Sequence, residues 1–287
     1  MIFYLTGRSQ AVCIDGALSS FRPVQVGVPQ GSILGPLFYI LFTNDLPETI
    51  LETDSHVHWS NFTTDCQECG SLCCFADDST YSISSQDQGT LQQKLNDRYR
   101  VMASYLGNNR LKLNDDKTHL LIMTSKQKHR ILNIKTKIDT PIEEIKPIRT
   151  EKLLGIFIQN DLKWTEYILN NEKSLIKQLT SRISALKIIS RVANFKVRLV
   201  IANGIFCSKL IFQISLWGGT EDYLIKALQV LQNKAARVVC KGDKFTSVST
   251  LLKQCGWLSV KQLVFFHSVV LVYKTFLTTY PKYIFNK

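Results

Sequence analysis

Residues 72–83 read Leu-Cys-Cys-Phe-Ala-Asp-Asp-Ser-Thr-Tyr-Ser-Ile, and this stretch says most about the fold of the chain. An apolar strand ends in two adjacent acids and resumes with alternating polar and apolar residues, which predicts a β-hairpin with the acids at its tip. Mg²⁺ takes carboxylate oxygens and keeps its remaining positions for water and phosphate. Because successive strand residues point to opposite faces, only a turn lets both acids approach one metal site. We expect Asp77 to be the main metal ligand and Asp78 a second one, both as catalytic residues.

An Asp-Asp pair alone is weak support for a metal site, because Asp is favoured in turns for its local hydrogen bonds to the backbone. Three more blocks accompany the pair. They are residues 27–38 (Gly-Val-Pro-Gln-Gly-Ser-Ile-Leu-Gly-Pro-Leu-Phe), 110–118 (Arg-Leu-Lys-Leu-Asn-Asp-Asp-Lys-Thr) and 152–156 (Lys-Leu-Leu-Gly-Ile). In this order the four blocks resemble the successive palm motifs of reverse transcriptases of non-long-terminal-repeat (LINE-type) retrotransposons. Residues 256–262 (Gly-Trp-Leu-Ser-Val-Lys-Gln) are similar to the tail that follows the polymerase in those elements.

The resemblance implies an α+β fold: a partial right-hand polymerase palm, with an antiparallel sheet and helices on one face, followed by an all-α thumb-like bundle. Residue patterns favour the same fold class. Apolar alternation on both sides of Asp15-Gly16 predicts a hairpin. Pro36 predicts the start of a helix that runs to about Asn44.

From Thr165 onward the pattern changes to helices. Two stripes at helical spacing predict core-facing sides, namely Ile168, Leu175, Ile176, Leu179, Ile183, Leu186 and Ile189, and then Leu224, Ala227, Leu228, Leu231, Ala235 and Val238. We therefore expect an N-terminally truncated palm at residues 1–164 with an insertion at 48–70, a helical thumb-like domain at 165–240, and a C-terminal helical tail at 241–287.

Formal charge is unevenly distributed along the 287 residues. The net charge is +12 overall, but it is −5 over residues 1–125, +9 over 126–200 and +8 over 201–287. Scattered lysines serve solubility, whereas a sustained excess in one half favours a polyanionic partner such as nucleic acid. The same excess suits a polymerase and a protein that only binds nucleic acid.

The apolar runs favour neither secretion nor membrane insertion. Met1–Leu5 is too short before Arg8 to be a signal peptide. The stretches Val200–Trp217 and Leu263–Leu277 are interrupted by polar residues, so we expect buried helices rather than membrane spans. We expect an intracellular protein, nuclear or cytoplasmic, with no membrane partner.

Four of the eight cysteines lie together at residues 66–74, downstream of two histidines. Cys66 and Cys69 have the Cys-x-x-Cys spacing of a structural Zn²⁺ site. The alternative is an ordinary loop insertion with free thiols, because Cys73 and Cys74 belong to the strand before the acids. The sequence leaves both interpretations open.

The resemblance also implies roles for individual residues. Gly27, Gln30 and Gly31 fall in the block that shapes the pocket for the incoming nucleotide and the template base, and Phe75, just before the acids, is also expected to bind nucleotide or template. Glycine lets the backbone approach a ligand closely, and the Gln30 amide both donates and accepts hydrogen bonds.

Two further positions follow from the same resemblance. Lys117 matches a lysine near the leaving pyrophosphate, where a cation offsets developing charge. Leu154 and Gly155 match the primer-grip hairpin, which positions the primer 3′ end.

The family reaction is in-line attack of a DNA primer 3′-hydroxyl on the α-phosphorus of a deoxynucleoside triphosphate, directed by an RNA template and assisted by two Mg²⁺ or Mn²⁺ ions. The family carries a further essential aspartate well before the Gly-Val-Pro-Gln-Gly block, and this chain begins too late to contain it. Asp15, in its Asp-Gly turn, is interpreted as a loop acid. We therefore expect this polypeptide not to polymerise at a useful rate. The alternative is a nonenzymatic remnant of a retrotransposon that binds RNA or RNA–DNA hybrid.

Overall fold

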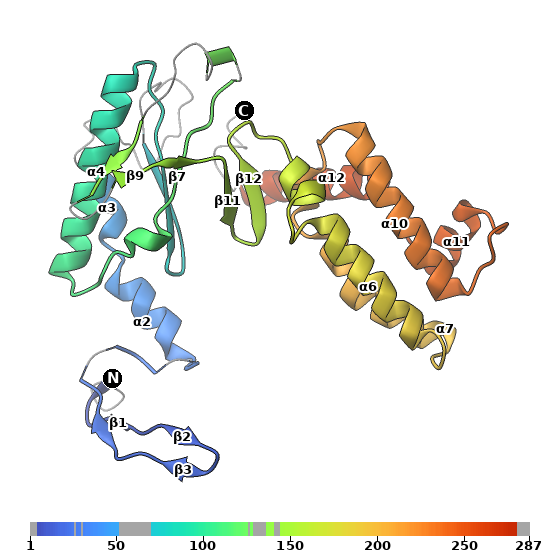
Figure 1. Ribbon diagram of the computed structural model, residues 1–287, viewed down its shortest axis with the longest axis horizontal. Helices are drawn as coiled ribbons and strands as arrows, with labels where there is room; N and C mark the ends of the chain where they lie inside the picture. The colour runs from blue at the N-terminus through green and yellow to red at the C-terminus, as the bar shows by residue number, and fades with distance from the viewer. Residues whose placement is uncertain are drawn as a thin grey trace. The chain divides into compact units, whose positions relative to one another are not determined.

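The computed structural model describes residues 5–25, 27–29, 31–51, 70–125, 127–128, 136–140 and 144–279 (Figure 1). The predictions for Gln30, Cys66 and Cys69 lie outside these residues. Among the described residues, packing separates a first compact unit that ends at Leu113 from a second that begins at Asn114.

The first unit opens with a narrow two-stranded ribbon. Strand β1 (Ser9–Gln10) pairs with β4 (Arg22–Pro23), and β2 (Cys13–Ile14) pairs with β3 (Ala17–Leu18). Asp15 and Gly16 form the two-residue turn, with φ of 50° and 84°. Two positive φ values are what this hairpin turn requires, and Asp-Gly supplies them most readily. The predicted hairpin is confirmed, and Asp15 is a turn residue.

Three helices and one hairpin make up the rest of the first unit as far as its residues are described. They are α2 (Leu34–Phe42), α3 (Leu46–Leu51), β5 (Ser71–Phe75), β6 (Asp78–Ser82) and α4 (Gln88–Asn108). The small core holds Leu46, Ile50 and Tyr105. The buried Arg98 guanidinium donates to the Ile50 carbonyl oxygen at 2.6 Å, which ties α4 to α3. Residues 48–51, the start of the insertion expected at 48–70, belong to α3, because proline at residue 47 is tolerated in a first helical turn.

The second unit begins with short strands. They are β7 (Leu120–Leu121), β8 (Ile138–Asp139), β9 (Glu144–Ile145), β10 (Pro147–Ile148), β11 (Thr150–Leu153) and β12 (Ile156–Gln159), preceded by the 3₁₀ turn η1 (Asp115–Lys117). Strand β7 pairs with β10 in parallel, and β8–β9 and β11–β12 are antiparallel hairpins.

Helices form the remainder, as the apolar spacing predicts. They are η2 (Glu166–Asn170), α6 (Leu175–Ile189), α7 (Phe195–Ala202), η3 (Asn203–Cys207), α8 (Ser208–Ile211), α9 (Ile214–Trp217), α10 (Asp222–Cys240), α11 (Val248–Cys255) and α12 (Val260–Thr278). Both predicted stripes face the core, with Leu179 and Leu186 of α6 and Leu224 and Leu228 of α10 fully buried. Ile156 of β12 joins the same core, so the β11–β12 hairpin and the bundle fold as one body.

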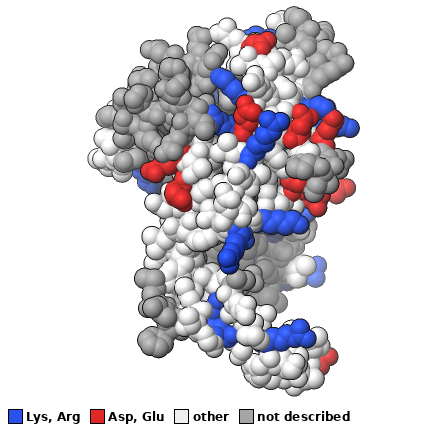
Figure 2. All heavy atoms as spheres, turned by 90° about the vertical axis from the view of Figure 1, so that its left-hand side faces the viewer, with Lys and Arg blue, Asp and Glu red and all other residues white. Residues whose placement is uncertain are grey.

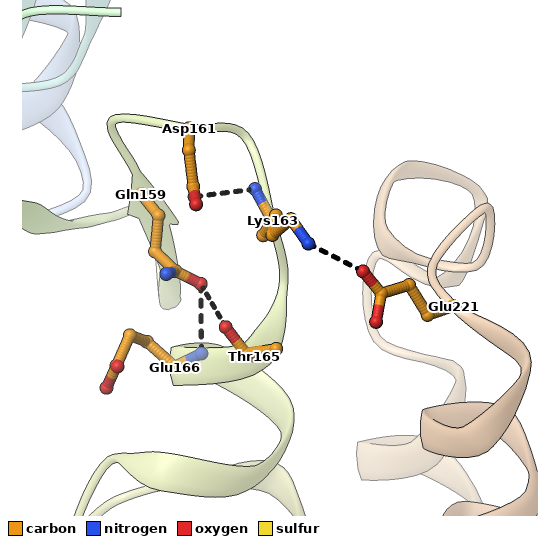
Figure 3. A network of polar contacts seen from close by, with 6 residues as sticks. All are labelled: Gln159, Asp161, Lys163, Thr165, Glu166 and Glu221. Carbon is orange, nitrogen blue, oxygen red and sulfur yellow. Dashed lines mark hydrogen bonds and ion pairs between the residues drawn. The ribbon is translucent and has the colours of Figure 1, made fainter. Parts of the chain in front are cut away.

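Polar contacts fasten this hairpin to the helices (Figure 3). Gln159 is 2% exposed, and its Oε1 accepts hydrogen bonds from Thr165 Oγ1 at 3.1 Å and from the Glu166 N–H at 3.0 Å. Lys163 Nζ reaches Glu221 Oε1 at 2.7 Å, just before α10. The Gln159 side chain gives the Glu166 N–H, at the start of η2, a hydrogen-bond acceptor. These contacts connect residues on the two sides of Trp164, where a domain boundary was predicted. The functional boundaries at residues 164 and 240 stay predictions.

Helix α12 differs from the prediction of a buried helix. Val260 and Thr275 are buried, whereas Phe265, Val269 and Phe276 are exposed. A helix that is apolar on all sides buries only the side that packs against other elements. In α12 this side faces α9 and α10, and Val264 lies close to Gly218 at the end of α9. By length and composition α12 is the one helix in the described part of the chain that could cross a membrane. The Val200–Trp217 stretch does bury Phe206, Leu210 and Trp217, as predicted.

The chain contains both helices and strands, as the predicted α+β fold class requires. The arrangement as palm and thumb stays a prediction. The described strands pair in twos, five times antiparallel and once parallel. Most of these ladders are two residues long, and within residues 5–279 the described strands do not assemble into the single larger sheet that the resemblance implies.

Candidate functional site

The acidic pair lies where a tight hairpin reverses. Strands β5 and β6 pair from Ser71↔Ser82 to Phe75↔Asp78, so Ala76 and Asp77 form a two-residue turn and Asp78 opens the return strand. Ala76 adopts a left-handed φ of 53°, which a residue with a Cβ adopts at a cost of about 1–2 kcal/mol. The predicted hairpin with acids at its tip is therefore confirmed, and its turn is conformationally strained.

Both carboxylates of the turn are open to solvent. Asp77 and Asp78 are exposed, and among the described residues no side chain donates a hydrogen bond to them or forms an ion pair with them. Phe75, the strand residue before the turn, is 62% exposed. Two unpartnered carboxylates fit Mg²⁺ or Mn²⁺, which accepts one or two protein carboxylates beside water and phosphate. Within the described residues, no cluster of three or more His, Cys, Asp or Glu side chains surrounds them.

Tyr39 of α2 lies within electrostatic range of the turn. Burial, followed by the electrostatic effects of Asp77 and Cys74, raises the pKa of the Tyr39 hydroxyl above its usual value. The hydroxyl is therefore a neutral hydrogen-bond donor within electrostatic range of Asp77. No sequence signal marked Tyr39, because it looks like any apolar-face residue of a helix.

The loop before α2 carries the predicted nucleotide-binding glycines. Gly27 and Gly31 have φ of 78° and 80°, and a Cβ on either would meet nothing within 4 Å. Glycine is thus required here by the backbone conformation. The Arg8 guanidinium donates to the Gly27 carbonyl oxygen at 2.6 Å and fixes one end of the loop. Gln30, between the two glycines, lies outside the described residues.

Lys117 and the predicted primer-grip residues belong to the second unit. Lys117 is exposed at the end of η1. Two residues later, His119 Nδ1 lies 2.8 Å from Glu151 Oε2 of β11, so the Lys117 segment and the β11–β12 hairpin are linked.

Leu154 and Gly155 form the two-residue turn of the β11–β12 hairpin. Their φ values are 46° and 89°, and Leu153 pairs with Ile156 across the turn. Double positive φ matches the twist of the strands, and it is readily adopted by glycine and costly for leucine. The turn is therefore tight, and its leucine is 41% exposed.

A basic and aromatic cluster lies beside this turn. Lys209 Nζ is 5.1 Å from the centre of the Phe212 ring, and a Cβ added to Gly155 would lie 3.4 Å from that ring. Burial, followed by the positive charges of Arg182 and Lys152, lowers the pKa of Lys209. Three cations from β11, α6 and α8 thus lie within electrostatic range of one another. Sequence reasoning missed the cluster, because its members are far apart in the chain.

Charge elsewhere is more mixed. On the face drawn in Figure 2, basic side chains lie among acidic ones in the upper part and as separate groups in the lower part, and they do not form one continuous patch. The net positive charge of the sequence therefore does not by itself locate a nucleic-acid binding site. The cluster of Lys152, Arg182 and Lys209 is a more specific candidate for one.

Comparisons with known proteins identify the family of the chain. The family model described as reverse transcriptase (RNA-dependent DNA polymerase) matches residues 3–186, more than half of the chain. The chain is 26% identical over 251 residues to the "Probable RNA-directed DNA polymerase from transposon X-element" of Drosophila melanogaster, covering 86% of this chain and 25% of that protein. It is 25% identical over 272 residues to the corresponding protein from transposon BS of the same fly, covering 92% and 28%. A short match to the RNA-directed DNA polymerase from mobile element jockey of Drosophila melanogaster is 48% identical over 44 residues, covering 15% and 5%.

The chain thus spans about a quarter of the length of the X-element and BS proteins. The family match includes the described part of the first unit and continues through η1 and the β11–β12 hairpin into α6. No solved structure matches the chain significantly.

Proposed function

The chain belongs to the reverse transcriptase (RNA-dependent DNA polymerase) family, and we propose that its β5–β6 hairpin carries the metal-binding acids of RNA-templated DNA synthesis of the LINE type. In this proposal the first unit and the β11–β12 hairpin form part of a polymerase palm, and the helices from α6 onward form a thumb-like part. Asp77 is the principal metal ligand and Asp78 the second.

One observation supports this function above others: Asp77 in a strained hairpin turn and Asp78 next to it are both exposed, and neither carboxylate has a hydrogen-bond or ion-pair partner among the described residues. A surface turn that served only to reverse the chain would relax with glycine at residue 76, because glycine adopts positive φ without cost. Strain of this kind persists where the position of a side chain matters. When bound, Mg²⁺ would supply Lewis-acid stabilisation of phosphate oxygens.

The remaining residues have roles in holding the substrates. The Gly27–Gly31 loop, with its open space around both glycines, would admit the sugar and base of a deoxynucleoside triphosphate. Lys117 would offset charge on the leaving pyrophosphate. The Leu154–Gly155 turn would support the primer 3′ end on an RNA template.

The test uses nucleotide selection, which does not require turnover. A fluorescent DNA primer ending in a dideoxynucleotide is annealed to an RNA template, and its affinity for the chain is measured by anisotropy in Mn²⁺. The complementary deoxynucleoside triphosphate is expected to tighten binding, and a noncomplementary one is not. The D77N variant should lose this effect.

D15N is the matched control for D77N, because Asp15 also lies in an exposed two-residue hairpin turn. It should behave like the wild type. Hybrid binding that ignores the nucleotide in the wild type, or nucleotide selection that survives in D77N, would contradict the proposal.

A second function, binding of RNA or RNA–DNA hybrid without catalysis, is favoured by the Lys152, Arg182 and Lys209 cluster beside Phe212. Grouped cations attract the phosphate backbone, and an adjacent ring offers a stacking surface for bases. Affinity that falls steeply with salt and is unaffected by D77N and D78N would distinguish this function from the first.

A further inference from the structure

Two cysteines meet at the corner between α10 and α11. Cys240 is the last residue of α10, and Cys255 is the last residue of α11. Their Sγ atoms are 3.4 Å apart, and Cys240 Sγ is also 3.8 Å from the carbonyl oxygen of Leu251. Leu251 and Cys255 are one helical turn apart, so Cys240 lies against the inner face of α11.

The corner is held by backbone contacts that do not depend on the thiols. Lys241 ends α10 with a φ of 53°, and the Gly242 N–H donates to the Arg237 carbonyl oxygen at 3.1 Å. A Cβ on Gly242 would lie 2.7 Å from Leu251 Cδ2, so the loop passes tightly over α11. Asp243 Oδ1 accepts the Thr246 N–H at 2.6 Å and shapes the start of α11.

We propose that Cys240 and Cys255 form an oxidisable dithiol site, which closes to a disulfide when a disulfide oxidant such as oxidised glutathione is present. A disulfide requires Sγ atoms about 2.05 Å apart, so the two sulfurs must approach by a little over 1 Å. Both residues lie at the last position of their helices, so the approach involves side chains at two helix ends.

The reaction is a two-step thiol–disulfide exchange. Cys240 gives its proton to solvent, and its thiolate attacks one sulfur of oxidised glutathione, forms a mixed disulfide and releases one glutathione thiolate. Cys255 then gives its proton to solvent and attacks Cys240 Sγ, forming the Cys240–Cys255 bond and releasing the second glutathione. The two cysteines lose two electrons and two protons, and the oxidant is reduced to two thiols.

The order of attack follows from exposure. Cys255 is buried and Cys240 is partly exposed. Burial, followed by the hydrogen bond with Cys240, raises the pKa of Cys255, so its thiol stays protonated near neutral pH and reacts second. Burial also raises the pKa of Cys207 to about 12. Cys207 is the third thiol of this neighbourhood and serves as the internal control.

The experiment maps the disulfide directly in the full chain. Purified protein is treated with oxidised glutathione, remaining thiols are alkylated, and tryptic peptides are analysed by mass spectrometry. Cleavage after Arg237, Lys241, Lys253 and Lys261 should yield one linked pair, Val238–Lys241 joined to Gln254–Lys261, about 2 Da lighter than the separate peptides. Dithiothreitol should separate the pair.

Variants and unfolding complete the test. C207S should still form the linked pair, whereas C240S and C255S should not. Because the link would close a loop between the ends of two packed helices, oxidised wild type should unfold at a higher temperature than reduced wild type. Absence of the linked pair in the wild type, or linkage of either cysteine to Cys207 instead, would overturn the proposal even if the serine variants fail to fold.

Discussion

The aromatic ring of Phe212 lies close to Gly155, because a Cβ added to Gly155 would be 3.4 Å from the ring atoms Cε1 and Cζ. Gly155 is the second residue of the β11–β12 turn, and Phe212 follows α8. The contact places the turn against the helical part of its own unit. The geometry of the hairpin tip therefore depends on residues about sixty positions downstream in the chain.

Replacing Gly155 with alanine should destabilise the second unit. The φ of 89° is unfavourable for any residue with a Cβ, and we expect a loss of about 1–2 kcal/mol in the free energy of unfolding. Gly107→Ala is the control, since Gly107 lies in helix α4 with open space around it and should gain about 0.5 kcal/mol. Denaturant titration measures both, and equal effects would show that the turn does not require glycine.

Gln159→Ala should also destabilise the second unit. It removes the acceptor for Thr165 Oγ1 and for the Glu166 N–H, and the expected loss is about 1–2 kcal/mol because the amide site is 2% exposed. Gln254→Ala, at an exposed position of α11, should change the free energy of unfolding little. A loss for Gln159→Ala no greater than that of the control would mean that this contact does not hold β12 to η2.

Tyr105 should make the first unit sensitive to high pH. Burial, followed by a hydrogen bond to Asp45 Oδ1 at 2.5 Å, raises the pKa of Tyr105 to about 12. The folded state thus keeps a proton that the unfolded state loses near pH 10, so the stabilisation is complete below pH 10 and is lost as pH rises toward 12.

The measurement compares the free energy of unfolding of wild type and Y105F between pH 8 and about 12. The difference between the two proteins should shrink above pH 10, because lysine titration affects both equally. A difference that stays constant over this range would show that the proton on Tyr105 does not contribute.

The basic cluster should contribute measurably to nucleic-acid binding. Lys152→Ala and Lys209→Ala should each lower the slope of log affinity against log salt by about 1, because each removes one phosphate contact. Lys196→Ala, at an exposed position of α7, should leave the slope unchanged. Three identical slopes would show that binding follows net charge and not the cluster.

Local patterns predicted much of the secondary structure. The Asp15-Gly16 turn, the acidic hairpin and the core stripes of α6 and α10 all follow from short-range spacing. Each is determined by residues within a few positions of one another, where turn preference and apolar periodicity dominate.

Long-range features were beyond such patterns. The position of Tyr39 near Asp77, the contact of Phe212 with Gly155, and the pairing of Cys240 with Cys255 join residues separated by many positions. For helix α12, the local pattern gave a wrong prediction. Its continuous apolar character predicted burial, but burial depends on how much neighbouring surface is present to cover it.

The central proposal is that the Asp77 and Asp78 carboxylates bind a divalent metal ion, and Mn²⁺ binding tests it most directly. The loss of the free Mn²⁺ electron paramagnetic resonance signal is titrated for wild type, D77N, D78N and D15N. We predict that D77N weakens binding by about tenfold or more, that D78N weakens it less, and that D15N matches the wild type. Equal Mn²⁺ affinity in wild type and D77N, or an equal loss in D15N, would contradict the assignment.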